Sequence, residues 1–89
     1  MIYSVGCEYA IRVLVKLAQQ SAAGGFVLLR SLVETENMPE HFVGKVLQTL
    51  VHADILVSAK GRGGGFALAR PPGQITLRQV VNAIDGPER

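Results

Sequence analysis

Residues 39–69 read PEHFVGKVLQTLVHADILVSAKGRGGGFALA, and this stretch contains the pattern that decides the fold. From Pro39 to Ala53 apolar residues recur at three- and four-residue steps, which predicts a helix with one buried stripe. Two short apolar runs follow at 55–59 and 66–69, and the six residues between them include four glycines. Such runs around a glycine-rich turn are typical of a β-hairpin. The stripe of the helix is predicted to consist of Phe42, Val43, Val46, Leu47, Leu50 and Val51.

Two further helices are predicted before this stretch. The first begins near Ser4, whose hydroxyl can cap it, and ends at the glycines 24–25. Residues 26–28 are too short for more than a fragment of edge strand. Residues 29–36 predict a short second helix, which ends at 37–39 because proline cannot continue it. The core-facing residues of these helices are expected to be Cys7, Ala10, Ile11, Leu14, Leu17 and Ala18, then Leu29, Leu32 and Val33.

A last helix is predicted after the hairpin. The sequence Arg-Pro-Pro-Gly at 70–73 indicates a rigid connector, and Thr76 with Gln79 three residues later is the pattern of a capping box. Residues 85–87 (Asp-Gly-Pro) end this helix. Its apolar face is expected to hold Leu77, Val80, Val81 and Ile84. The whole pattern therefore predicts a mainly α fold with one small β-hairpin.

Length and composition limit the classes of protein to which the chain can belong. It has 89 residues, a formal net charge of +2 and one cysteine. This length is typical of one small domain, so residues 1–89 are interpreted as a single unit. One cysteine excludes disulfides and multi-cysteine metal sites within the chain. No apolar run approaches the roughly 20 residues that a membrane-spanning helix needs. Charged residues near the N-terminus interrupt the stretch where the apolar core of a signal peptide would lie. A cytoplasmic location is therefore expected.

The positive charge is unevenly distributed along the chain. Residues 41–78 carry five basic side chains against one acidic one, a balance of +4, whereas residues 1–40 and 79–89 each come to −1. A basic middle segment favours a polyanionic partner. The five basic residues are Lys45, Lys60, Arg62, Arg70 and Arg78.

Two helices joined by a short linker and followed by a hairpin are the layout of a winged helix-turn-helix domain. The major groove of duplex DNA is about 12 Å wide and admits one α-helix, here the helix at 39–53. Its outer face carries hydrogen-bonding side chains around a glycine that allows close approach of the backbone. These residues are His41, Gly44, Lys45, Gln48 and His52. An ordinary amphipathic helix with a solvated polar face is the alternative interpretation.

The tip of the hairpin favours the nucleic-acid interpretation. Its four glycines make it slim, and Lys60 and Arg62 project from it. Such a tip can lie along the DNA backbone or enter the minor groove, where negative potential attracts arginine. The alternative interpretation is that these two basic residues only increase the solubility of the protein. Nucleotide-binding loops do not fit, because no Gly-Lys-Ser/Thr triplet occurs and a strand follows the glycines.

The sequence contains few residues in an arrangement suited to catalysis, so the chain is not expected to be an enzyme. His41 and His52 stand eleven residues apart on one helix, about 16 Å, and cannot share a metal ion. Cys7 falls on the apolar stripe of the first helix and is most simply a small core residue. Its place near a helix N-terminus also allows a lowered thiol pKa and redox reactivity.

The chain resembles, over nearly its whole length, the DNA-binding portion of the Rrf2 family of bacterial transcriptional regulators. The resemblance rests on YAIRVL at 9–14, PEHFV at 39–43, KVLQTL at 45–50, and SAKGRGGGFALARP at 58–71 followed by ITL at 75–77. The glycine-rich wing joined to Ala-Arg-Pro is the most specific of these motifs. The resemblance implies sequence-specific binding of a palindromic double-stranded DNA operator by a homodimer, usually to repress transcription.

The resemblance also implies roles for individual residues. The positions that match base-contacting residues of the family are Pro39, His41, Gly44 and Lys45. Lys60 matches the wing position that enters the minor groove, and Arg12 and Arg30 match positions that contact the DNA backbone. Gly44 stands where glutamate or glutamine is common, so known operators do not transfer directly. Many family members hold an iron–sulfur cluster on three cysteines beyond the last helix seen here, and those ligands are absent, so no cofactor is expected within this chain.

The leading hypothesis is therefore a DNA-binding module of a transcriptional regulator. Its contacts are expected from Pro39, His41, Gly44, Lys45, Gln48, Lys60 and Arg62. The alternative, favoured by the modest net charge, is a winged-helix protein-interaction module that does not bind DNA. A third hypothesis is a thiol sensor built on Cys7.

Overall fold

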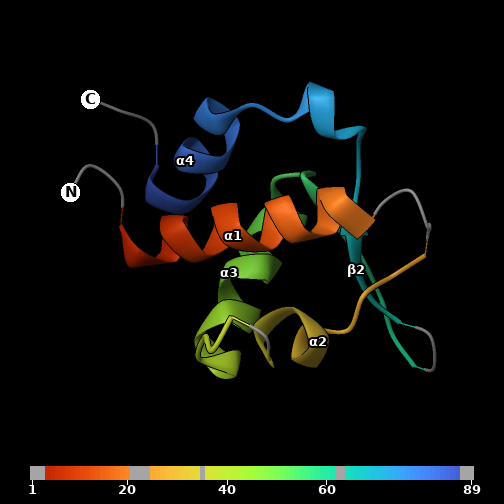
Figure 1. Ribbon diagram of the computed structural model, residues 1–89. Coiled ribbons are helices and arrows are strands. Elements are labelled where there is room, and N and C mark those ends of the chain that lie inside the picture. The colour runs from red at the N-terminus through yellow and green to blue at the C-terminus, as the bar shows by residue number, and fades with distance from the viewer. Residues whose placement is uncertain (1–3, 21–24, 35, 62–63, 87–89) are drawn as a thin grey trace.

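The architecture is mainly helical, with one two-stranded antiparallel sheet, as predicted. The computed structural model describes residues 4–20, 25–34, 36–61 and 64–86 (Figure 1). Helix α1 crosses the middle of the molecule, with α4 on one side and α2 and α3 on the other, and the hairpin projects beyond the helices. The elements in chain order are α1 (Val5–Gln20), α2 (Leu29–Glu34), α3 (Glu40–His52), β1 (Leu56–Ala59), β2 (Gly65–Leu68), the 3₁₀ turn η2 (Pro72–Gln74) and α4 (Leu77–Asp85).

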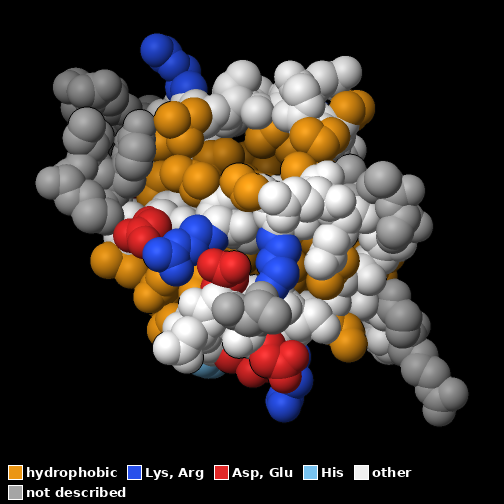
Figure 2. Space-filling view, in the orientation of Figure 1, with side chains coloured by type: hydrophobic (Ala, Val, Ile, Leu, Met, Phe, Trp, Pro, Cys, Tyr) orange, Lys and Arg blue, Asp and Glu red, His pale blue; other side chains and the backbone are white. Residues whose placement is uncertain are grey.

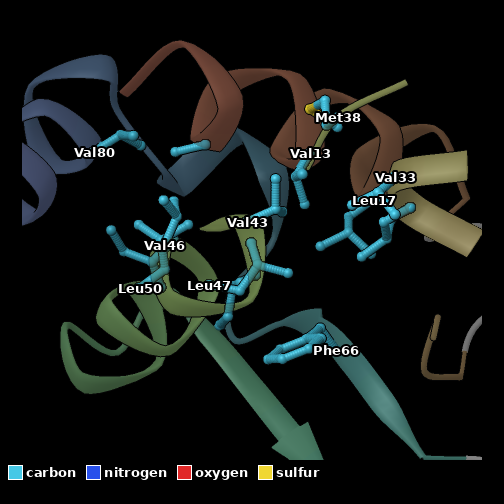
Figure 3. Packing of buried hydrophobic residues seen from close by; sticks show 14 of the residues in the cluster. Val13, Leu17, Val33, Met38, Val43, Val46, Leu47, Leu50, Phe66 and Val80 are labelled. Carbon is cyan, nitrogen blue, oxygen red and sulfur yellow. The ribbon is translucent and has the colours of Figure 1, made fainter. Parts of the chain in front are cut away.

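The core lies between α1 and α3. Figure 3 shows Val13 and Leu17 of α1 directed toward Val43 and Leu47 of α3, with Phe66 of β2 closing one end. No polar or charged side chain is buried among the described residues, so hydrophobic packing dominates the stability of this cluster. Its buried members are Cys7, Ala10, Val13, Leu17, Leu32, Val33, Met38, Val43, Val46, Leu47, Leu50, Ile55, Leu56, Phe66 and Val80.

The predicted caps of the first and last helices are confirmed. The Ser4 hydroxyl accepts a hydrogen bond from the backbone N–H of Cys7 at 3.1 Å. At α4, Thr76 Oγ1 accepts from the N–H of Gln79 at 3.1 Å, and the Gln79 side chain accepts from the N–H of Thr76 at 3.0 Å. The backbone N–H and hydroxyl of Ser4 also both donate to the carboxylate of Asp85. This interaction fastens the start of α1 to the end of α4.

The boundaries of the two middle helices differ slightly from the prediction. Helix α2 ends at Glu34, two residues before the predicted end. The chain turns at Asn37, whose φ is +55°, and the N–H of Met38 bonds to the carbonyl of Val33 at 3.3 Å. The left-handed backbone at Asn37 is incompatible with a continued α-helix, and the side chain of Met38 beyond it is buried in the core. Pro39 is the extended N-cap of α3 rather than its first helical residue.

Some predicted core residues lie at the surface instead. The exposed fractions of Phe42 and Leu77 are 41% and 49%. Phe42 stands in the first turn of α3, beyond the core, and packs edge-on against Tyr9 with ring centroids 5.7 Å apart. The prediction for Leu77 is wrong because α4 lies at the periphery, where Val80 is its one fully buried residue.

The hairpin is close to its predicted position, and a backbone bridge joins it to the segment before α2. The strands pair Leu56 with Leu68 and end with Ala59 opposite Gly65. The N–H of Phe66 donates to the carbonyl of Val27 at 2.8 Å, and the N–H of Val27 donates to the carbonyl of Phe66 at 2.9 Å. The predicted strand fragment at 26–28 is therefore a single bridge.

An apolar groove of about 250 Å³ remains along α1. Figure 2 shows hydrophobic side chains gathered on this face, between α1 and the segment from η2 to α4. Ile11, Leu14 and Ala18, predicted to be core residues, are only partly buried because they line this groove. Part of the apolar stripe of α1 therefore packs in the core, and the rest lines a groove at the surface.

Gly65 offers a test of the bridge between hairpin and helices. Its φ is +126°, and a Cβ there would lie 2.2 Å from the carbonyl oxygen of Val27. We expect Gly65→Ala to lower the free energy of unfolding by about 2 kcal/mol or more, through backbone strain and disruption of the bridge. Gly61→Ala is the matched control: φ is +83° with open space around it, so it should cost only roughly 1 kcal/mol. Equal urea midpoints for the two variants would contradict this account.

Candidate nucleic-acid interface

The outward face of α3 presents a row of polar side chains on a buried support. Val43, Val46, Leu47 and Leu50 anchor the opposite face of the helix in the core. His41, Lys45 and Gln48 are exposed and, with Glu40, Gly44 and Leu29, surround an open hollow of about 440 Å³. The structure thus brings together four of the predicted DNA-binding residues on one surface. Pro39, also exposed, adjoins them as the N-cap of the helix.

The hairpin carries the remaining predicted DNA-binding residues. Lys60 is exposed directly after β1. The turn is closed by a hydrogen bond from the N–H of Gly64 to the carbonyl of Gly61 at 3.0 Å. Arg62 lies outside the described residues. Among the residues that the structure does describe, no ion pair joins Lys45 or Lys60 to an acid, so their charges remain available to a polyanion.

Lys16 is a positioning residue that the sequence pattern did not reveal. Glu8, Arg12 and Lys16 stand four residues apart along α1 and so share one face of that helix, and the first two form a surface ion pair at 2.9 Å. The ammonium of Lys16 instead donates to the backbone carbonyls of Ser31 at 3.2 Å and Leu32 at 3.4 Å. These carbonyls belong to α2, and a cation near the last turn of a helix is favourable. Lys16 therefore holds α2, on which α3 packs, against α1.

Cys7 does not have the environment of a reactive thiol. Its side chain is fully buried among core residues. Burial, and after it the negative charge of Asp85, raises the pKa of this thiol above its ordinary value. The suggestion that the helix N-terminus lowers its pKa is therefore wrong, because desolvation of the thiolate outweighs the helix dipole here. A buried protonated thiol is a poor nucleophile.

Neither a cluster of metal-ligating residues nor a helix able to span a membrane occurs in the described part of the chain. Within 4–20, 25–34, 36–61 and 64–86, no three His, Cys, Asp or Glu residues lie close enough to hold a metal ion. None of the helices in those segments is long and apolar enough to cross a bilayer.

The fold and the α3 surface together define a winged helix-turn-helix domain. A family model, Rrf2, described as an iron-dependent transcriptional regulator, matches residues 3–89. The chain therefore belongs to the Rrf2 family, which is a family of transcriptional regulators and not of enzymes. The resemblance noted in the sequence and the predicted fold class are both confirmed.

Relatives and solved structures agree with this membership. A Mycobacterium tuberculosis protein, named as a candidate HTH-type transcriptional regulator, is 37% identical over 87 residues, which are 98% of this chain and 53% of that protein. The HTH-type transcriptional regulator CymR of Bacillus subtilis is 28% identical over 80 residues, 90% of this chain and 57% of that protein. The chain thus spans about half the length of these relatives.

Two solved structures share the fold. The structure of B. subtilis CymR (YrzC), described as the global cysteine regulator, superposes with a TM-score of 0.91 at 26% identity, covering 98% of this chain and 67% of that one. IscR of T. potens superposes with a TM-score of 0.85 at 26% identity, covering 94% and 61%. The winged-helix arrangement is therefore common to these regulators and this chain.

The family description includes iron dependence, and the residues that the structure describes do not fit a protein-bound iron site. The single cysteine of the chain, Cys7, is buried with a raised thiol pKa. The acidic and histidine residues in the described segments form no cluster of three. An iron or iron–sulfur centre needs several such ligands around one point.

Lys16→Met tests the positioning of α2. This change keeps much of the apolar stem and removes the ammonium, so two carbonyls of α2 are left without their charged donor. We expect the free energy of unfolding to fall by about 1 kcal/mol. Lys45→Met, which removes the same charge from an exposed site, should stay within about 0.5 kcal/mol of wild type. Urea unfolding followed by circular dichroism gives both values, and identical values would refute the role of Lys16.

Proposed function

We propose that this chain binds a specific sequence of double-stranded DNA as the DNA-binding part of a transcriptional regulator. The observation that carries the proposal is the exposed face of α3, held from behind by its buried stripe and flanked by a slim basic hairpin. In this proposal α3 enters the major groove and the hairpin enters the minor groove. The residues assigned to DNA binding are Pro39, His41, Gly44, Lys45, Gln48, Lys60 and Arg62.

The charge distribution supports this assignment. Lys45 lies on α3 and Lys60 beside the turn, so the two basic side chains stand on the elements that would meet DNA. The acid on the same face is Glu40, in the first turn of α3, where its negative charge stabilises the helix N-terminus. A carboxylate there can also accept a hydrogen bond from a cytosine amino group.

The proposed assembly is a homodimer on a palindromic operator, acting in the cytoplasm and usually repressing transcription. Family membership supports this choice, because two-fold symmetric regulators read two-fold symmetric sites. The apolar groove along α1 supports it as well, since it leaves hydrophobic surface for a partner to cover. We propose no cofactor within these 89 residues. The alternative of a protein-interaction module without DNA binding has no support among the relatives.

The hairpin can be tested through the salt dependence of binding. We expect Lys60→Ala combined with Arg62→Ala to weaken binding to every duplex, because both residues are assigned to the phosphate backbone or minor groove. For each phosphate that no longer meets a basic side chain, the slope of log Kd against log salt concentration should become shallower by about 0.9. Arg78→Ala on α4, exposed and outside this surface, serves as a control with unchanged slope. An unchanged slope in the double variant would remove the hairpin from the interface.

Helix α3 can be tested through sequence preference. Selection of duplexes from a random pool should enrich one motif with the wild-type protein. Gln48→Ala and His41→Ala should then relax preference at separate positions of that motif, by about 1–3 kcal/mol for each base edge that the side chain recognises. Competition fluorescence anisotropy with single-base operator variants measures this change. Absence of any enriched motif, with binding that salt abolishes entirely, would instead favour the protein-interaction module.

A further inference from the structure

The outward face of α3 is interrupted at its centre by the hollow around Gly44. Gly44 is half-buried, and a Cβ built on it would meet the Cδ2 atom of Leu29 at 3.2 Å. Apart from its chain neighbours and the backbone of α3, Leu29 is the one residue within 4 Å of that position in the described part of the chain. The missing side chain therefore uncovers an apolar floor supplied by α2. The interface is not uniformly polar.

Polar groups surround this floor on α3. His41 lies three residues before Gly44, Lys45 follows it, and Gln48 lies four residues after it, so all share one helix face. His41, Lys45 and Gln48 are exposed and can reach base edges or phosphates. A ligand group that enters the hollow is thus positioned by hydrogen-bonding neighbours and meets Leu29 at the bottom.

The chemistry of the major groove limits what can occupy this position. Base edges there carry hydrogen-bond donors and acceptors, and among the unmodified bases only thymine adds a methyl group. A carbonyl or amino group placed over Leu29 would lose water without gaining a hydrogen-bond partner, which is unfavourable. A methyl group placed there gains by leaving water. The apolar floor therefore favours a methyl group over the carbonyl and amino groups of the base edges.

We propose that Leu29 and Gly44 form a subsite for the 5-methyl group of a thymine in each operator half-site. This proposal rests on the DNA-binding function proposed above and adds a specificity determinant to it. Gly44 acts by its lack of a side chain and Leu29 by direct contact. Any larger residue at 44 would cover the floor, so the subsite depends on glycine.

Replacement of thymine by deoxyuridine tests the subsite, because the two bases differ only in the 5-methyl group. After selection of an operator from the random pool, each thymine is replaced in turn. The affinity of the wild-type protein should fall roughly fourfold at one thymine per half-site, the value expected for one buried methyl. 5-Bromodeoxyuridine at that position should restore binding, since bromine has nearly the size of a methyl group. Fluorescence anisotropy gives the dissociation constants.

Gly44→Ser provides the second arm of the test. Serine would place a Cβ and a polar hydroxyl over Leu29, so the thymine methyl would lose its apolar contact and the thymine-to-deoxyuridine ratio should fall to about one. Gly73→Ser is the matched control, because Gly73 lies in open space on η2, away from α3, and should keep the ratio at roughly four. Thermal unfolding of both variants shows that they are folded.

The outcomes separate this inference from the proposed function. An enriched operator with no thymine that distinguishes methyl from hydrogen would overturn the subsite and leave DNA binding intact. Retention of the full ratio by folded Gly44→Ser would also overturn it. If no operator is enriched at all, the proposed function fails and the subsite fails with it.

Discussion

The packing of α3 against α1 is the interaction on which the rest of this structure depends. Val43, Leu47 and Leu50 of α3 have no appreciable exposure, and they share one buried cluster with Ala10 and Val13 of α1. Figure 3 shows Val13 directed toward Val43. Helix α3 also packs against α2, α4 and β1. Apart from the exposed Phe42, its apolar side is therefore occupied by protein, and its polar side is left for a ligand. A helix held in this way can present His41, Lys45 and Gln48 in one fixed orientation, which sequence-specific binding requires.

Two smaller interactions fix the neighbours of α3. Lys16 donates to carbonyls of α2, and the paired hydrogen bonds between Val27 and Phe66 attach the hairpin to the segment that leads into α2. The first interaction joins a lysine side chain to backbone carbonyls, and the second joins backbone to backbone. The placement of the paired strands β1 and β2 relative to α3 is consequently a property of the fold. Glycine at 65 is the local requirement for this attachment.

Features that depend on residues three or four positions apart were predicted correctly from the sequence. Features that depend on contact with a distant part of the chain were not. The capping box of Thr76 and Gln79 was predicted because both of its hydrogen bonds are local. Phe42 continued the apolar stripe of its helix, yet nothing in that periodicity indicates where the core ends. Lys16 stood in line with Glu8 and Arg12, and only the position of α2 shows that its ammonium meets carbonyl groups. The polar residues of α3 were predicted from their shared face, whereas the apolar floor under Gly44 was not.

The sequence by itself determined the order of the elements, the amphipathic character of α3 and the basic glycine-rich turn, because periodicity, capping and turn chemistry are encoded within a few neighbouring residues. Family membership could also be inferred from contiguous motifs. The tertiary structure decided which apolar residues became core and which lined the groove along α1. It decided the raised thiol pKa of Cys7 and the placement of Leu29 beneath Gly44. These features arise where helices cross, and a crossing joins residues whose separation along the chain carries no periodic signal.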